Sequence, residues 1–203
     1  YTQLTCTILC KYGMVKNVRP REKDNDWSPT MIEILDDSYF LELQTALPDV
    51  ICRNEQITYI PGKKQYSVTV WGDRYTIDPV ALSFDTSAIT NPPPHEYFYL
   101  FILYYLLRIK QFPLMNEWIS EKDLPGGPTF FRGPHLVPTN LISTTFGNDL
   151  DAFSAWCKEQ GGIAIDMGDA AFRFQITADI PVVVLYWLGD EDFPAEAKVL
   201  FDK

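Results

Sequence analysis

The sequence predicts an α+β protein with a single main domain, in which antiparallel sheet elements at both ends flank a buried central helix and two shorter helices. Three observations predict this class. Apolar and polar residues alternate with a period of two near 57–77 and again near 163–188. An uninterrupted apolar segment lies between them, and two stretches between 139 and 160 begin with helix-capping residue types.

The first 55 residues have an uneven composition. An apolar start is followed by the polar run NVRPREKDNDWSP, which is typical of a linker or surface loop. We therefore expect residues 1–55 to be an N-terminal segment or extension and residues 56–203 to form the main α+β domain. The chain begins at Tyr1, and we expect it to be trimmed from a longer one.

A short antiparallel meander is predicted next. Residues 57–60 and 66–70 flank the turn PGKK, and a second turn at Gly72 and Asp73 leads into a third strand at 75–77. The clearest helix follows, because about fifteen residues without a helix breaker lie between three prolines at 92–94 and Pro113. It is apolar nearly all round, so we expect it inside the fold.

The remaining elements follow from caps and periodicity. We expect a strand at TFFRG, a short helix capped by Thr139, and a second helix that begins near Asp149 and ends at Gly161. Three strands follow, and the last, PVVVLYWLG, is apolar enough to be covered on both faces.

The charge and the cysteines limit the partners and the compartment. The net charge is −10 with no basic patch, which argues against nucleic acid and against an anionic membrane surface. No apolar run approaches the roughly 20 residues that span a bilayer. Four sparse cysteines, at positions 6, 10, 52 and 157, are unlike a disulfide framework, and we expect a reducing cytoplasm.

The turn TFFRGPHLVP presents Arg132 and His135 together. A guanidinium offers a planar donor fork for a carboxylate or phosphate, and an imidazole can ligate a metal or the iron or cobalt of a tetrapyrrole. The alternative is that Arg132 pairs with a nearby acid and that His135 bonds a loop carbonyl. The only other histidine, His95, is expected either to cap the central helix or to be simply exposed, and it has no partner at zinc-ligand spacing.

Two groups of charged residues are further candidates for ligand binding. Asp190 and Glu191 follow the last apolar strand, where carboxylates can act in catalysis or bind a hard cation. The alternative is a solvated turn whose acids cap a helix beginning near Pro194. Asp169 and Arg173 lie in MGDAAFRF and are expected to form an ion pair across a bend. No residue can be assigned a catalytic role, and no metal site is predicted.

The ordered motifs LYYLLR, LPGG, FFRGPH, GDAAFRF and VVVLYWLGDEDFPAEAKVLFD support a resemblance. Together they resemble a family found in anaerobes, domain of unknown function 3786, over roughly Ile57 to Lys203. The resemblance singles out Arg132, Gly133, His135, Asp169, Arg173, Gly189, Asp190, Glu191 and Pro194. It also implies a link to iron-sulfur modules and to corrinoid and one-carbon enzymes.

Three functions remain open. The first is an accessory or binding module of anaerobic metabolism that binds a small molecule. The candidate ligand is a corrinoid, haem or other tetrapyrrole, with His135 as axial ligand and Arg132 as anion clamp. The second is an enzyme that uses Asp190 and Glu191 as acid and base or as metal ligands, which requires these acids and Arg132 to converge in one cleft. The third is a protein-interaction module with an exposed aromatic surface.

Overall fold

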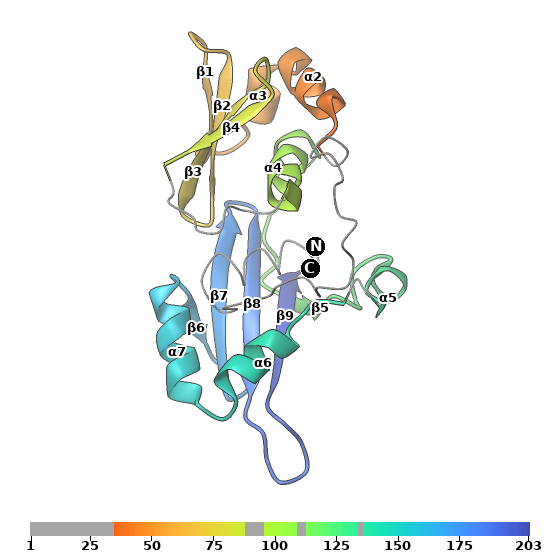
Figure 1. Cartoon of the computed structure of the whole chain (residues 1–203), viewed down its shortest axis with the longest axis vertical. Coiled ribbons are helices and arrows are strands. Elements are labelled where there is room, and N and C mark those ends of the chain that lie inside the picture. Colours follow the sequence, from red (N-terminus) through yellow and green to blue (C-terminus); the bar gives the residue numbers. More distant parts are fainter. Residues whose placement is uncertain (1–34, 88–95, 109–112, 134–135) are drawn as a thin grey trace, which may run out of the picture. The chain divides into compact units, whose positions relative to one another are not determined.

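The computed structural model of the chain describes residues 35–87, 96–108, 113–133 and 136–203. They form two compact units, one within Asn17–Phe112 and one that includes Pro113–Lys203 (Figure 1). The elements of the first unit are α2 (Asp37–Thr45), α3 (Pro48–Ile51), β1 (Ile57–Ile60), β2 (Gln65–Val70), β3 (Asp73–Asp78), β4 (Ser83–Thr86) and α4 (Glu96–Arg108). Those of the second are β5 (Trp118–Ser120), α5 (Gly127–Phe130), α6 (Asn140–Phe146), α7 (Leu150–Glu159), β6 (Ile163–Ile165), β7 (Ala170–Thr177), β8 (Ile180–Trp187) and β9 (Glu196–Asp202).

The first unit is built on a four-stranded antiparallel meander. Its strands lie in the order β1-β2-β3-β4, with Tyr66 opposite Ile77 and Val68 opposite Tyr75. These four side chains share one face of the sheet and are fully or almost fully buried. The predicted meander is confirmed.

The central helix α4 packs on this sheet. The Phe98 ring lies edge-on to Tyr75 at a centroid distance of 5.2 Å, and four further α4 side chains are buried. Arg53 donates from Nη2 to the carbonyl of Tyr105 at 2.6 Å and from Nη1 to that of Leu106 at 3.2 Å. The guanidinium thus caps carbonyls in the last turn of the helix, where a positive charge is favoured. The predicted buried helix is confirmed.

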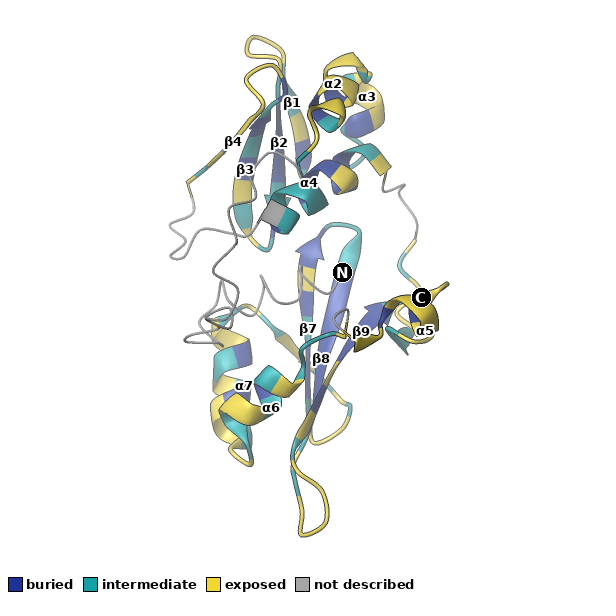
Figure 2. Cartoon of the chain, turned by 45° about the vertical axis from the view of Figure 1, so that its right-hand side comes forward, coloured by how far each residue is buried: buried dark blue, intermediate teal, exposed yellow. Residues whose placement is uncertain are grey.

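The second unit is built on a five-stranded antiparallel sheet in the order β5-β9-β8-β7-β6. Helix α6 packs against β9 and α7 against β7 (Figure 1). The ring of Phe153 on α7 stacks on Tyr186 of β8 at 4.4 Å. All six residues from Pro181 to Tyr186 are buried, as Figure 2 shows, so the prediction that this strand is covered on both faces is confirmed.

The fold class is α+β with antiparallel sheets, as predicted, but two local predictions are wrong. The segment TFFRG does not form a strand, because Gly127–Phe130 is a short helix. The chain after Pro194 is not a helix either. It forms β9, since buried Ala197, Val199 and Phe201 alternate with Lys198 and pair with β8 from Glu196 to Phe201.

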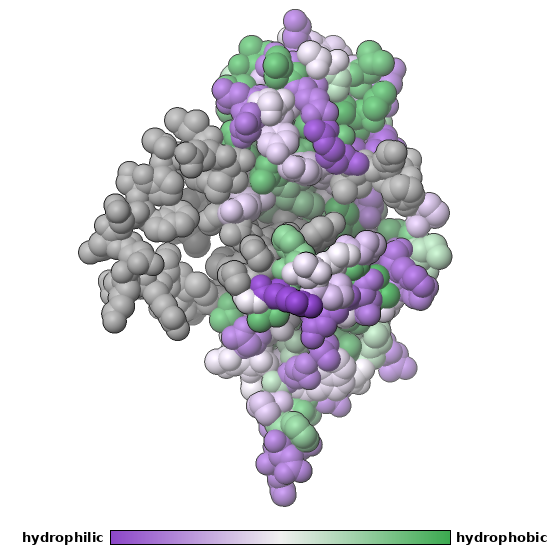
Figure 3. All heavy atoms as spheres, turned by 90° about the vertical axis from the view of Figure 1, so that its right-hand side faces the viewer, coloured by the Kyte–Doolittle hydropathy of each residue, from purple (hydrophilic) through white to green (hydrophobic). Residues whose placement is uncertain are grey.

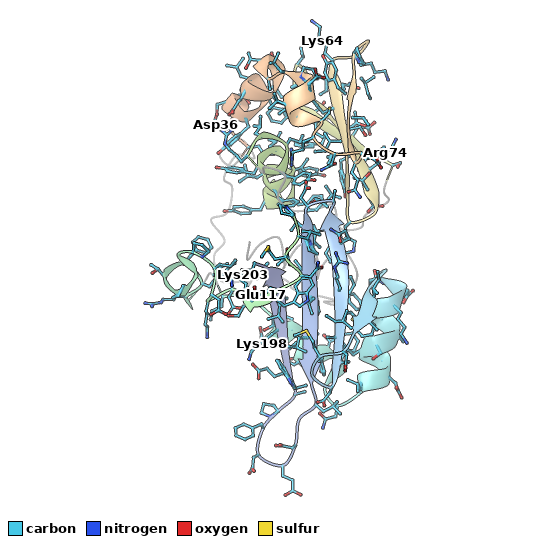
Figure 4. All side chains as sticks on the ribbon, turned by 180° about the vertical axis from the view of Figure 1, so that it is seen from behind. Asp36, Lys64, Arg74, Glu117, Lys198 and Lys203 are labelled. Carbon is cyan, nitrogen blue, oxygen red and sulfur yellow. The ribbon has the colours of Figure 1, made fainter. Side chains whose placement is uncertain are left out.

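The edge of the second sheet is closed by an ion pair. The Lys203 ammonium lies 3.0 Å from a carboxylate oxygen of Glu117, as Figure 4 shows from behind. The backbone amide of Lys203 also donates to the backbone carbonyl of Glu117 at 3.0 Å. These contacts extend the pairing of β5 with β9 by one residue, at the end where the chain enters β5.

Candidate ligand-binding site

A hollow of about 420 Å³ lies beside α5 in the second unit. Its volume is within the range of small-molecule sites in proteins, about 300–1,000 Å³. The residues that line it are Lys122, Pro128, Phe131, Arg132, Gly133 and Leu136. They come from the turn after β5, from α5 and from the chain that follows α5, so the hollow is built by one continuous segment.

Two glycines explain how this segment folds. Gly126 has a φ of 76°, a left-handed conformation that glycine adopts without strain. Gly127 is buried, and a Cβ atom at this position would collide with the backbone carbonyl oxygen of Glu121. The motif LPGGP therefore lets α5 lie directly on the backbone of the turn that carries Lys122, which brings that lysine to the same hollow as Arg132.

The turn between β5 and α5 is also fixed by a side chain. Asp123 accepts from the Ser120 hydroxyl at 2.6 Å and from the Ser120 amide at 3.1 Å. These hydrogen bonds lower the pKa of the Asp123 carboxyl, the hydroxyl having the larger effect. The carboxylate of Asp123, the residue directly after Lys122, is thus engaged with Ser120.

Arg132 is held by the helix that precedes it, α5. Its Nε donates to the carbonyl of Pro128. The side chain is otherwise exposed, and neither Arg132 nor Lys122 forms an ion pair with a residue that the structure describes. The two Nη groups of Arg132 and the ammonium of Lys122 can therefore donate to an anion in the hollow, which has no acidic residue in its lining.

The rest of the lining is apolar. Phe131 is 5% exposed and forms the inner wall, while Leu136 is 54% exposed. Phe130 packs edge-on against Phe131 at 5.1 Å and is itself 50% exposed. The hollow thus combines two positive charges with an aromatic and aliphatic wall, a combination that suits a ligand with an anionic group on an apolar body.

The two histidines lie outside the described residues, as do Cys6 and Cys10. In the sequence, His135 comes two residues after Gly133 and directly before Leu136, both of which line the hollow. Its predicted role as an axial ligand stays a prediction.

Asp169 and Arg173 do not form the predicted ion pair. The Asp169 carboxylate accepts from the amide of Leu188 at 2.7 Å, and its own amide donates to the carbonyl of Tyr186. Arg173 donates from Nη2 to Gln175 at 3.0 Å, and its buried Nε has no hydrogen-bond partner among the described residues. The Leu188 amide, directly after β8, therefore takes the place that the sequence assigned to the guanidinium.

Asp190 closes the loop between β8 and β9. Its Oδ1 accepts from the amides of Asp192 at 2.9 Å and Phe193 at 2.8 Å. These amides lower the pKa of the carboxyl, that of Phe193 having the larger effect. Asp190 therefore acts as a turn residue, as in the second interpretation, but β9 rather than a helix follows this turn. Glu191 is exposed beside it.

The predicted site residues do not converge. Asp169, Asp190 and Glu191 lie at the end of the second sheet where Trp187 pairs with Glu196. Arg132 follows α5, which lies beside the opposite end of β9, where Asp202 pairs with Trp118 (Figures 1 and 2). The single cleft that the carboxylate-enzyme hypothesis requires is therefore not formed.

The profile of the family described as Domain of unknown function (DUF3786) matches residues 48–203. The chain belongs to this family. The match confirms the resemblance. It begins at the first residue of α3, so it adds residues 48–56 to the range that the sequence motifs assigned to the family. No curated protein and no solved structure matches the chain.

Two further features bear on this DUF3786 member. Among its described residues, no group of three His, Cys, Asp or Glu side chains is arranged to hold a metal ion. No helix in the same residues has the length and apolar character needed to cross a bilayer.

Lys122 is the site residue that sequence reasoning missed in this DUF3786 member. It lies ten positions before Arg132, and no motif joins the two. The signal that could have found it is the GG pair at 126–127, because two adjacent glycines before a proline indicate a tight approach of two backbone segments.

Proposed function

We propose that this DUF3786 member is a binding module for a ligand that carries an anionic group on an apolar body. The observation that carries the proposal is the presence of Arg132 and Lys122 in one hollow with Phe131 and Leu136. A guanidinium with both Nη groups available forms two parallel hydrogen bonds with a carboxylate or phosphate. The apolar wall supplies the remaining affinity by removing the body of the ligand from water.

A tetrapyrrole is the ligand class that we propose more specifically. Haem carries propionate groups, and a corrinoid with its nucleotide loop carries a phosphate, so either presents an anion to Arg132. His135, close to Arg132 in the sequence, would then be the axial ligand. The assignment to anaerobic metabolism belongs to this more specific proposal.

We also propose that the module lies in the cytoplasm. The two cysteines within the described residues, Cys52 and Cys157, are free thiols. Free thiols are usual in a reducing compartment, where glutathione and thioredoxin keep them reduced.

The anion-binding proposal is tested with an anionic aromatic dye, 1-anilinonaphthalene-8-sulfonate, as the probe. We expect the folded chain to enhance its fluorescence, and we expect Arg132→Gln and Lys122→Gln each to weaken binding several-fold. The matched control is Arg74→Gln, since Arg74 is an exposed arginine of the first sheet (Figure 4). Equal binding by all four proteins would contradict the proposal.

The tetrapyrrole proposal needs a separate experiment. Haemin and hydroxocobalamin are titrated into anaerobically purified protein, and absorption spectra are recorded. We expect a shift of the absorption bands for one of them, lost in His135→Ala and weakened in Arg132→Gln. No spectral change with the unsubstituted chain would refute the tetrapyrrole class and leave the broader anion proposal standing.

A further inference from the structure

The loop between β8 and β9 projects from the end of the second sheet opposite α5, as Figures 1 and 2 show. It carries the exposed aromatic side chain of Phe193. Phe193 is 72% exposed, the largest exposed fraction among the large apolar side chains of the described residues. A phenyl ring left in water is costly, and a ring fixed in a projecting loop is the kind of anchor that dominates protein interfaces.

The loop is built to hold this ring in place. The amide of Asp190 donates to the carbonyl of Phe193 at 2.8 Å, and the Asp190 carboxylate accepts from the Phe193 amide at 2.8 Å. Gly189 packs so closely against the returning chain that a Cβ there would lie 2.6 Å from the amide nitrogen of Ala195. Asn148 bonds both the amide and the carbonyl of Gly189, at 2.8 and 3.2 Å. Little conformational entropy remains to be lost when the ring binds a partner.

The charge around the ring is negative. Glu191 and Asp192 directly precede Phe193 and are both exposed, and neither forms an ion pair with a described residue. The only described cation in β9, Lys198, is engaged with Glu196 at 3.3 Å and lies over the Trp187 ring. Figure 3 shows this end of the unit as hydrophilic residues with hydrophobic ones beside them. We call Glu191, Asp192 and Phe193 the tip.

The hollow beside α5 has the complementary character. It offers the two cations Lys122 and Arg132 and an apolar wall, and its 420 Å³ has room for a phenyl ring. The tip and the hollow lie at opposite ends of one unit, so a tip cannot enter the hollow of its own unit. A second copy of the chain can supply the tip.

We propose that the tip of one copy docks in the hollow of a second copy, with Phe193 against Phe131 and Leu136 and the tip carboxylates on Lys122 and Arg132. The contact joins two different surfaces, so a single contact leaves one tip and one hollow free. Contacts of this kind close into a ring where the geometry allows, a reciprocal pair included, and otherwise extend into an open chain. We expect three tip residues in this hollow to bury less than about 1,200 Å², the range of weak, concentration-dependent associations.

This inference rests on the proposed function, because it requires the same hollow to accept an anion beside an apolar group. Sedimentation velocity over a concentration series tests it on the full chain. We expect the average sedimentation coefficient to rise with concentration and to fall when salt is added, because salt screens the exposed charges. Phe193→Ser should abolish the rise, whereas Leu47→Ser, a control at an apolar side chain of the first unit that is 70% exposed, should not.

A charge exchange makes the test specific to this pair of surfaces. The variant Glu191→Lys/Asp192→Lys has a basic tip and a basic hollow, and the variant Lys122→Glu/Arg132→Glu has an acidic tip and an acidic hollow. Each should remain monomeric alone, and an equimolar mixture should associate. Lys122→Glu alone provides a second hollow variant that leaves the bond from Arg132 to Pro128 intact.

The outcomes separate the two proposals. A wild-type chain that stays monomeric but binds the anionic dye overturns the docking and leaves the proposed function standing. A wild-type chain that neither associates nor binds the dye overturns both. Association that persists in Phe193→Ser and in both charge-exchanged variants also overturns the docking, because another surface then joins the copies.

Discussion

Each Nη nitrogen of Arg108 donates to a different carboxylate oxygen of Glu42, at 2.5 and 2.6 Å, so the last turn of α4 is joined to α2 by a two-point ion pair. The hydrogen bonds from Arg108 lower the pKa of the Glu42 carboxyl. A carboxyl whose pKa is lowered in the folded state stabilises that state above its ordinary pKa, and this contribution is lost as the pH falls through the lowered value.

We therefore expect a pH-dependent coupling between Glu42 and Arg108. A double-mutant cycle with Glu42→Gln and Arg108→Gln, measured by urea unfolding, should give a favourable coupling at neutral pH that disappears in acid. Both side chains are almost half exposed, so the coupling should also shrink in high salt. A coupling that is unchanged at low pH would show that the carboxylate charge does not contribute.

The close approach of α5 to the preceding turn gives a second prediction. Gly127→Ala places a methyl group against the carbonyl oxygen of Glu121, and backbone atoms must move to make room. We expect a loss of about 1–3 kcal/mol in the free energy of unfolding, as for other overpacked sites. Binding of the anionic dye should weaken as well, because Lys122 and Arg132 lose their common position.

The control for this substitution is Gly62→Ala. Gly62 has no atom within 4 Å of an added Cβ and no positive φ. It should change neither stability nor dye binding. If Gly127→Ala behaves like Gly62→Ala, α5 does not depend on this contact.

A buried hydroxyl gives a third prediction. Thr177 is 1% exposed, and its Oγ1 has no hydrogen-bond partner among the described residues. Thr177→Val replaces the hydroxyl by a methyl group of similar size. We therefore expect the free energy of unfolding to stay unchanged or to rise by up to about 1 kcal/mol. Thr177→Ser keeps the hydroxyl and removes the methyl, and it should destabilise by about 1 kcal/mol. Thermal unfolding of both variants measures the difference. If Thr177→Val is less stable than Thr177→Ser, the hydroxyl has a hydrogen-bond partner in the native protein.

The elements that sequence reasoning found are those with a strong local signal. The helix 96–108 has a long breaker-free apolar run, and α7 has Asp149, which accepts from the Ala152 amide as an N-cap. The strand β9 was predicted as helix because the acids before it resemble caps. The alternation of Ala197, Val199 and Phe201 is a strand signal, and pairing with the buried strand β8 decides the outcome.

The candidate site was only half visible in the sequence. Arg132 stood out because it lies on a turn rich in glycine and proline. Lys122 did not, because its position depends on how Gly127 packs against Glu121, which is a tertiary contact. The sequence also indicates Asp190 as a candidate ligand-binding residue. In the structure its carboxylate instead accepts hydrogen bonds from two backbone amides of its own loop.

A fourth prediction concerns the two described thiols. Burial raises the pKa of Cys157 to about 12 from a usual value of 9, and it also raises the pKa of Cys52, which is only half-buried. A thiol whose pKa is raised in the folded state contributes stability below its usual pKa, and that contribution is lost as the pH rises through the raised value. Stability should therefore decline between about pH 9 and pH 12.

Alkylation with iodoacetamide measures the same burial directly. At pH 8 we expect Cys157 to be labelled only after unfolding, and Cys52 to be labelled slowly in the native state, because the thiolate is the reactive form. Peptide mass spectrometry locates the label. Rapid native labelling at Cys157 would contradict its place on the buried face of α7.

The last prediction concerns Asn148, which joins the α6–α7 connection to the loop that carries Phe193. Its side chain accepts from the Gly189 amide at 2.8 Å and donates to the Gly189 carbonyl at 3.2 Å. Asn148→Ala removes both bonds and leaves Glu191, Asp192 and Phe193 unchanged. Hydrogen exchange should then become faster at the amides of Gly189 and Phe193, since the loop opens more often. Self-association should weaken several-fold, because a mobile tip loses more conformational entropy on docking.

Asn140→Ala, at an exposed position on α6, is the matched control and should alter neither measurement. Faster exchange in Asn148→Ala with undiminished association would mean that a rigid loop is not needed for docking.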